Sequence, residues 1–351
     1  MSHLRTLASV VILLGLSITS VEAQKARTRV VIGESRVENK NPEPGQLNTP
    51  FGVDFDAAGN MYIVELGGGR VHKLDTAEKF ITLAGDGSKA YQGDGGPAAK
   101  ATFNGMHNIA VTPGGDLYIA DSWNHCVRKI DAKTGNISTV AGTGKPGFSG
   151  DGGPATKATF NFIMCVSLNP AYDKLYLADL KNRRIRVIDL ATQVVTTVAG
   201  NGNKGLPQDG SKAAESPLVD PRAVAVDAKN NVYILERSGH ALRVVDANGK
   251  IKTVVGTGEP GTAVGAALET QLGSPKHLAI DGENHVIIAD EANRRILKYD
   301  VVQQQVSILM GKGANKPNRG LSKPHGVCVH ADGTIFIVDT GHHRILSLKF
   351  R

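Results

Sequence analysis

The chain has 351 residues, of which 41% are hydrophobic and 21% are charged. These proportions exclude an intrinsically disordered chain and a coiled coil, because the apolar material suffices for a large core. Glycine contributes 41 residues, well above its usual share of about 7%, which indicates many turns. The formal net charge of +7 favours anionic partners.

The first 23 residues have the pattern of an export signal. Arg5 gives a basic start, an apolar stretch runs from Leu7 to Ile18, and Val21 and Ala23 offer the small residues of a cleavage site. We therefore expect a signal peptide at 1–23 and a single domain at 24–351. The protein is then exported, periplasmic or extracellular, with no membrane span after cleavage. An uncleaved N-terminal anchor is the alternative.

The chain has three cysteines, which are Cys126, Cys165 and Cys328. Export leads to an oxidising compartment, but an odd count leaves at least one thiol free. Cys165 and Cys328 stand where other repeats have Ala, Gly or Ser, so we interpret them as small core residues. The fold is not expected to depend on disulfides.

Six copies of one unit follow one another along the chain. Each has a strand-like run, a turn with Gly or Asn, and a second run that ends in an acidic residue. The copies cover residues 50–65, 106–121, 163–179, 221–236, 275–290 and 324–339. A third run follows each acid, and in five copies a fourth run ends in Gly. Alternating apolar residues broken by such turns indicate hairpins, so each unit has four short strands.

Four-stranded units repeated in a ring predict an all-β, six-bladed β-propeller of antiparallel blades. In the first runs, large apolar residues alternate with small ones, which fixes the register. The last copy ends with a third run, 345–350, and has no fourth run after it. Residues 28–33 (TRVVIG) match the fourth-run pattern. We therefore expect the N-terminal strand 28–33 to complete the last blade and close the ring.

The units resemble NHL repeats. The resemblance rests on DSWNHCVRKID at 121–131 and ISTVAGTGKPGFSGDGGPATKA at 137–158, and it extends over residues 28–351. It is closest to the exported bacterial form of the family and implies a six-bladed propeller. The family includes protein-binding and RNA-binding modules and the peptidyl-hydroxyglycine amidating lyases. Gluconolactonase-like enzymes are more distant propellers, so the fold alone does not define an activity.

Six acidic residues close the second runs, one in each copy: Glu65, Asp121, Asp179, Glu236, Asp290 and Asp339. A ring of carboxylates for acid–base catalysis is one interpretation. Because every copy has such an acid, we favour one local structural role performed six times. The carboxylate would accept backbone N–H groups or pair with Arg70, Arg184, Arg295 or Arg344 on the third runs.

Two GDGGPA segments, at 93–98 and 150–155, place Asp94 and Asp151 between glycines. We expect turns in which the Asp bonds its own backbone and Gly supplies the positive φ. A calcium loop is the alternative, but such loops usually gather several acids, and each segment has one.

One position departs from the repeat. The residue after the start of each copy should lie at one mouth of the channel, and it is Phe51, His107, Met164, Arg222, Lys276 and His325. His277 follows one step deeper. We predict that His107, Arg222, Lys276 and His325 converge on one opening and bind an anion. With ordinary pKa values near 6.5, the two imidazoles would strengthen binding as the pH falls, although mutual repulsion lowers both pKa values.

The resemblance to amidating lyases implies three histidines that hold Zn²⁺ at this position in alternate blades. Here those blades give His107, Arg222 and His325, and only Pro324-His325 keeps the Pro-His pair. A guanidinium does not ligate a metal. Trp123 stands where the resemblance implies an active-site Tyr. The sequence therefore identifies no catalytic residue and no metal set, and a divalent metal at the mouth stays open.

These patterns predict an exported binding or scaffolding propeller whose partner is a small anionic ligand or an extracellular polymer or protein. We expect a monomer. With 5% aromatic residues and one Trp, the chain offers little for base stacking, so no nucleic-acid partner is expected. The alternative is a propeller enzyme of lyase or lactonase type with its site at the same mouth.

Overall fold

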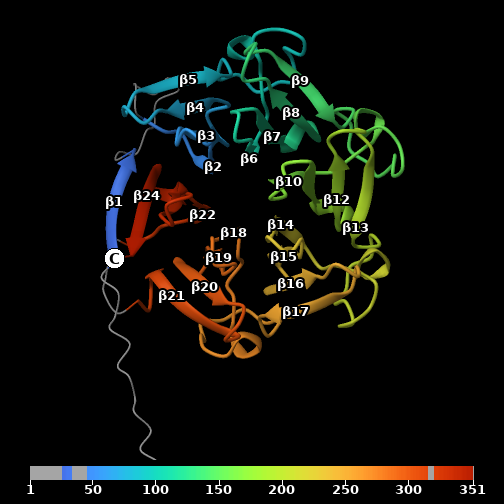
Figure 1. Ribbon diagram of the computed structural model, residues 1–351, viewed down its shortest axis with the longest axis vertical. Helices are drawn as coiled ribbons and strands as arrows, with labels where there is room; N and C mark the ends of the chain where they lie inside the picture. Colours follow the sequence, from blue (N-terminus) through green and yellow to red (C-terminus); the bar gives the residue numbers. More distant parts are fainter. Residues whose placement is uncertain (1–25, 34–45, 315–319, 351) are drawn as a thin grey trace, which may run out of the picture.

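Six four-stranded antiparallel sheets stand around a central channel in the computed structural model, which describes residues 26–33, 46–314 and 320–350 (Figure 1). The predicted all-β, six-bladed propeller is confirmed. The predicted signal peptide lies outside the described residues. Within the described ranges, no helix is long and apolar enough to cross a membrane.

Five blades run in chain order from an inner strand at the channel to an outer strand at the rim, and blade 6 takes its outer strand from the N-terminal end of the described chain. Blades 1 to 3 consist of β2 (Pro50–Phe55), β3 (Met61–Glu65), β4 (Val71–Leu74), β5 (Phe80–Ala84); β6 (Met106–Val111), β7 (Leu117–Asp121), β8 (Cys126–Ile130), β9 (Ile137–Ala141); and β10 (Ile163–Leu168), β11 (Lys174–Asp179), β12 (Arg184–Asp189), β13 (Val195–Ala199). Blades 4 to 6 consist of β14 (Pro221–Val226), β15 (Val232–Glu236), β16 (Ala241–Val245), β17 (Ile251–Val255); β18 (His277–Ile280), β19 (Val286–Asp290), β20 (Arg295–Asp300), β21 (Gln305–Gly311); and β22 (Pro324–Val329), β23 (Ile335–Asp339), β24 (Arg344–Phe350), β1 (Ala26–Ile32).

Short 3₁₀ helices occupy the loops. They are η1 (Ala98–Lys100), η2 (Ser122–Asn124), η3 (Ala155–Lys157), η4 (Leu180–Asn182), η5 (Ala213–Glu215), η6 (Ala267–Glu269) and η7 (Thr340–His342). Where the second strand turns into the third, a bulky residue often takes left-handed backbone angles, as His125 and His343 do at φ 54°. Each of these two imidazoles accepts a backbone N–H from the loop that enters the next blade, from Phe162 and Thr49 respectively. The turn thereby ties neighbouring blades together.

The ring closes where the two ends of the described chain meet in blade 6. Strand β1 pairs antiparallel with β24, with Thr28 opposite Leu348 and Val30 opposite Leu346 (Figure 1). The predicted closing strand at 28–33 is confirmed. It begins two residues earlier and ends at Ile32, because Gly33 turns away with φ +77°.

The six acids at the ends of the second strands are all fully buried. Each accepts a backbone N–H from the loop that precedes its blade; Asp121, for example, accepts that of Asn104 at 2.7 Å. Each also lies within 4 Å of a cationic or imidazole side chain on the third strand. The predicted structural role, repeated in every blade, is therefore confirmed.

The predicted arginine partners are correct in two blades of four. Arg295 pairs with Asp290 at 2.7 Å and Arg344 with Asp339 at 2.9 Å. Arg70 and Arg184 instead donate to backbone carbonyl groups. In those blades the partner stands two residues later, on the same face of the third strand, where His72 faces Glu65 and Arg186 faces Asp179.

Asp94 and Asp151 neither cap their own turns nor stand in a group of metal ligands. Asp94 receives the guanidinium of Arg128 at 2.8 and 3.1 Å, and Asp151 receives that of Arg186 at 2.7 and 3.0 Å. The expected bond to their own backbone was wrong, because a buried arginine on the third strand is the stronger partner. The expected positive φ is found at Gly93 and Gly150.

All three cysteines are free. Cys165 is buried, as predicted for a small core residue, and burial raises the pKa of its thiol to about 11. Cys328 is only half-buried, because its layer of the inner strands faces the channel.

The closing strand gives the first prediction. A variant that begins at residue 34 lacks β1, so the outer edge of β24 loses its ladder and is open to aggregation. At about 1 kcal/mol for each lost hydrogen bond, the free energy of unfolding should fall by roughly 5 kcal/mol. Thermal melting measures this against a variant that begins at residue 24. Equal melting temperatures would show that β1 does not hold the ring closed.

Candidate functional site

A β-bulge at the start of the inner strand sets the position of the predicted mouth residues. In five blades, two inner-strand residues span one step of the second strand, and the extra residue is Phe51, His107, Met164, Arg222 or His325. A bulge re-aims its side chain. In blade 5, Lys276 directly precedes β18 and donates its N–H to the Ala289 carbonyl group at 2.9 Å. In these five blades the shared repeat position is therefore the bulged residue of the inner strand.

The bulged side chains converge on the ring of Phe51. The ring centroid of His325 lies 4.2 Å from that of Phe51, and the ring of His107 lies edge-on at 4.8 Å. The guanidinium carbon of Arg222 stands 5.8 Å from the same centroid. Because these three residues come from blades 2, 4 and 6, their contact with one ring places them at the axis.

The rim of this mouth carries cations and two acids. Lys276 lies 3.8 Å from Glu291, and the same carboxylate lies 3.9 Å from the His325 ring. Arg237 donates to Asp220 at 2.8 Å. Each rim acid is thus matched by a cation of its own.

Among the residues that the structure describes, Arg222 has no carboxylate partner. The residue is 3% exposed, its Nη1 donates to the Met164 carbonyl group at 3.2 Å, and its Nε has no hydrogen-bond partner. Burial lowers its pKa to about 10. By contrast, the equally buried Arg128, Arg186 and Arg243 each pair with a carboxylate at 2.8 Å or less. An uncompensated buried charge is costly, so an anion bound beside Arg222 would lower this cost.

The two imidazoles of the mouth are neutral at physiological pH. Burial, and next the Arg222 charge, lower the pKa of His107 to about 3 and that of His325 to about 2. Both pKa values are thus lowered, as predicted, and lie well below the unperturbed value of about 6.5, because these rings are buried against Phe51. Repulsion by neighbouring cations acts in the predicted direction but is second to burial. The Nδ1 atom of His325 has no hydrogen-bond partner.

One residue deeper, side chains close the channel. Asn108 of blade 2 donates to His277 Nε2 of blade 5 at 2.9 Å, and these blades lie on opposite sides of the ring (Figure 1). His277 Nδ1 bonds the Val327 carbonyl group at 3.1 Å, which defines a neutral ring whose Nε2 accepts. Asn108 Oδ1 accepts the N–H of Val166 and the thiol of Cys165. We call Asn108, Cys165 and His277 the plug.

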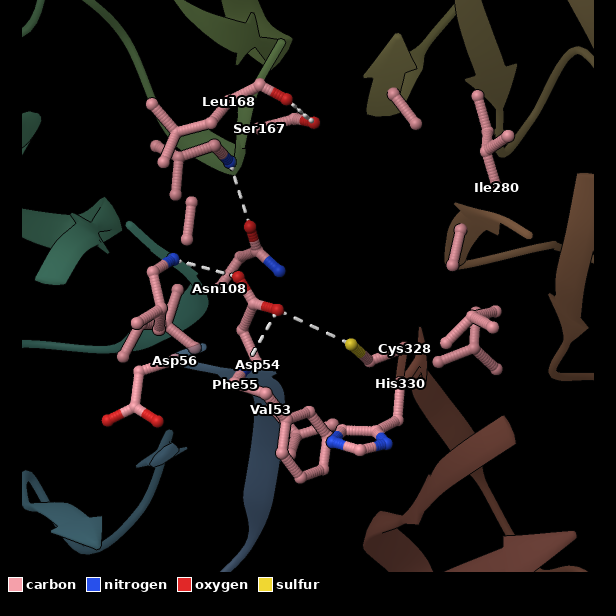
Figure 2. Close-up of a pocket in the computed structure, with 18 of the residues that line it drawn as sticks. Val53, Asp54, Phe55, Asp56, Asn108, Ser167, Leu168, Ile280, Cys328 and His330 are labelled. Atoms are coloured by element: carbon pink, nitrogen blue, oxygen red, sulfur yellow. Dashed lines mark hydrogen bonds between the residues drawn. The ribbon is translucent and has the colours of Figure 1, made fainter. Parts of the chain in front are cut away.

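Beyond the plug, a central cavity of about 680 Å³ opens toward the loops between the first and second strands (Figure 2). Its outer level is an apolar collar: Phe55, Val111, Leu168, Val226, Ile280 and Val329. The level beneath it holds small residues in five blades, but Asp54 in blade 1. None of His107, Arg222, Lys276 and His325 lines this cavity. The predicted mouth and this central cavity thus lie on opposite sides of the plug.

Sequence reasoning missed the role of Asp54, which it treated as one of the small inner-strand residues. Its carboxylate accepts the N–H of Val111 at 2.8 Å, that of Phe55 at 2.9 Å, and the thiol of Cys328 at 3.4 Å (Figure 2). Burial raises its pKa to about 6. The available signal was that a charged residue occupies a position held by Ala, Ser or Cys in the other five copies.

Trp123 lies on the mouth side of the plug. Its indole is 39% exposed, and its ring centroid lies 6.3 Å from that of His107. A Cβ on Gly105, which has φ +67°, would fall 2.4 Å from the indole, so the glycine allows the ring to lie on the backbone. The Lys89 ammonium stands 5.8 Å from the ring centroid. The rim therefore presents an exposed aromatic face beside the cationic mouth.

The mouth does not fit the three-histidine zinc site that the lyase resemblance implies. Arg222 stands in the third position, and His107 Nδ1 is already bonded to the Gly105 carbonyl group at 2.8 Å. Across the described residues, no group of three or more His, Cys, Asp and Glu side chains is placed to hold a metal ion.

Comparison with known families agrees with the repeat. The model described as NHL repeat matches residues 103–130 and 321–346, and the one described as Teneurin NHL domain matches residues 188–263. These matches fall on blade 2, on the stretch from the end of blade 3 through blade 4, and on blade 6. The chain is an NHL-repeat β-propeller.

Two curated proteins are similar to this chain in sequence. SUPPRESSOR OF QUENCHING 1 of Arabidopsis thaliana is 26% identical over 76% of the chain and 27% of its own length. NHL repeat-containing protein 2 of Gallus gallus is 24% identical over 87% of the chain and 47% of its own length. The chain thus spans less than half of each of these relatives.

Solved structures with the same fold are more distant in sequence. An auxiliary nutrient binding protein from Bacteroides thetaiotaomicron aligns over 93% of this chain and 77% of its own, with a TM-score of 0.66 and 14% identity. Virginiamycin B lyase from Staphylococcus aureus aligns over 93% and 99%, with a TM-score of 0.55 and 12% identity. At these identities, both structures are similar to this chain in fold alone.

The unpaired guanidinium gives the second prediction. Arg222→Met removes a buried charge from apolar surroundings, so the free energy of unfolding of the unliganded protein should rise by about 1 to 4 kcal/mol. The matched control is Arg243→Met, which leaves the buried Glu236 without its cation and should lower stability by about 3 to 5 kcal/mol. Urea denaturation measures both. Equal destabilisation by the two variants would mean that Arg222 is already compensated.

The neutral histidines give the third prediction. An imidazole whose folded pKa is depressed contributes stability that is complete above the unfolded pKa of about 6.5 and is lost as the pH falls toward the folded value. The loss is about 1.4 kcal/mol per pH unit for each ring. His325→Phe keeps an aromatic contact with Phe51 but cannot titrate. Between about pH 6.5 and 5, its free energy of unfolding should therefore fall by about 2 kcal/mol less than that of the wild type. Parallel stability curves would contradict the burial of a neutral His325.

Proposed function

We propose that this propeller is an exported binding module that takes a small anionic ligand at the mouth formed by His107, Arg222, Lys276 and His325. One observation carries the proposal, namely the buried Arg222 guanidinium with no carboxylate partner. A guanidinium presents a planar fork of donors that matches a carboxylate or phosphate. The ligand class is therefore a small carboxylate or phosphate.

The surroundings support the same ligand class. Lys276 adds a mobile charge, and burial lowers its pKa. The apolar ring of Phe51 lies near the Arg222 guanidinium and strengthens electrostatic interactions there, because it lowers the local polarity. The neutral imidazoles offer ring nitrogens for hydrogen bonds and add no charge. Anion affinity should therefore depend on Arg222 and Lys276 and vary little between about pH 6 and 8.

Export and a binding role have separate support. The first 23 residues have the pattern of a signal peptide. A Bacteroides protein with this fold is described as an auxiliary nutrient binding protein. Both are consistent with a module that meets its ligand outside the cytoplasm.

A second candidate function is an enzyme of lyase or lactonase type at the same mouth. His325 favours it, because its Nδ1 has no hydrogen-bond partner among the described residues and can accept a hydrogen bond from a substrate held beside Arg222. Incubation with uronate oligosaccharides and sugar lactones, with product detection and elemental analysis of the purified protein, tests this alternative. Turnover that is lost in His325→Gln would favour the enzyme.

The fourth prediction tests the binding module. Galacturonate, citrate and phosphate are titrated into the purified protein by calorimetry. At least one should bind, and Arg222→Met should weaken it at least about tenfold, because a charge-assisted hydrogen bond is worth about 1.5 to 3 kcal/mol. Arg27→Met, an exposed change of the same kind on the outer strand β1, should leave binding unchanged.

Two results of these titrations would contradict the proposal. Equal binding by wild type and Arg222→Met, or equal loss in Arg27→Met, would reject the mouth as the anion site. Binding that is much tighter at about pH 6 than at about pH 8 would show that the histidines carry charge there, against their burial.

A further inference from the structure

The central cavity on the far side of the plug has the size and shape of a ligand site. Its volume of about 680 Å³ falls within the range of small-molecule pockets, roughly 300 to 1,000 Å³. The plug closes its inner end through the bond between Asn108 and His277. Nothing in the proposed anion site requires this space.

The residues that line the cavity form two levels, which differ in size and polarity. The collar at the opening is apolar in all six blades, and Phe55, Leu168 and Ile280 stay half-buried there (Figure 2). The next level inward is widened by small residues such as Ala110 and Ala225. An entering molecule therefore meets apolar walls first and a roomier level beneath them.

The charge at the deeper level is negative. Asp54 accepts three hydrogen bonds, yet no cationic side chain pairs with it among the described residues. No Lys or Arg of the described ranges lines the cavity, and the plug's His277 is neutral, because burial lowers its pKa to about 4. The remaining titratable groups of the wall are Asp56, Tyr172, Cys328 and His330. An anion would meet repulsion here, and a cation would find its counter-charge.

Asp54 differs in this respect from the six buried acids that close the second strands. Each of those has a partner on the third strand, as Glu236 has Arg243 at 2.8 Å. A carboxylate in a low-polarity wall without such a partner favours a ligand that brings the cation with it.

We propose that the central cavity is a second ligand site, for a small organic cation whose ammonium group reaches Asp54 and whose apolar body fills the collar. The two ends of the channel then take ligands of opposite charge, with the plug between them. The ammonium would donate to the Asp54 carboxylate, while the body displaces water from Phe55, Leu168 and Ile280.

The fifth prediction tests this site with three probes of one shape. Benzylamine, benzyl alcohol and benzoate are titrated by calorimetry at about pH 8, where Asp54 is ionised. Benzylamine should bind at least about tenfold more tightly than either other probe, which is about 1.4 kcal/mol. Asp54→Asn keeps an acceptor for the Val111 N–H and should remove this preference.

A second variant keeps the test valid if Asp54→Asn folds poorly. Ser167→Leu fills the small level without touching the carboxylate and should weaken benzylamine at least about tenfold. Neither variant should change the affinity of the anion that the mouth binds, so this site and the proposed function can fail separately. Benzyl alcohol or benzoate binding as well as benzylamine, or benzylamine binding unchanged in both variants, would overturn the proposal.

Discussion

Closing six sheets into a ring leaves one strand edge of every sheet facing the axis. The inner strands β2, β6, β10, β14, β18 and β22 each pair on one side only. Buried backbone groups without partners are costly. Polar side chains of one blade therefore reach the inner strand of another: Asp54 accepts the N–H of Val111, Asn108 accepts that of Val166, and His277 donates to the carbonyl group of Val327. The plug and the cavity wall both follow from this constraint.

The same constraint explains why the mouth with Arg222 and the cavity with Asp54 coexist in one channel. The bulge at the entry of each inner strand turns one side chain toward one opening, and regular pairing resumes beyond it. One step deeper, Gly52 and Gly326 leave no room for side chains, since a Cβ would fall 2.9 and 2.5 Å from neighbouring backbone atoms. Asn108 and His277 cross the space that these glycines leave. Two steps further, small residues open the cavity.

The features that could be predicted from the sequence are those that recur in every copy of the repeat. Six copies gave the blades and their register, and the unmatched third run at 345–350 predicted that an N-terminal strand closes the ring. The shared slot predicted that His107, Arg222 and His325 meet. Partners set by distance in space could not be read from the repeat, as with Arg128 and Asp94, which are 34 residues apart. The protonation of His325 also depends on burial against Phe51, which periodicity does not reveal.

The charged residues that recur in every blade differ from Arg222 and Asp54, which each occur in one blade. The acids of the second strands recur in every blade and are matched in every blade, so their charges are internal to the fold. Arg222 and Asp54 each occur in one blade, stand on opposite sides of the plug, and lack a counter-ion within the described chain. Because both hold charge in surroundings of low polarity, each should lower the stability of the empty protein and each favours a ligand of opposite sign. The described chain offers neither Arg222 nor Asp54 a counter-ion, and a bound ligand of opposite sign would supply one.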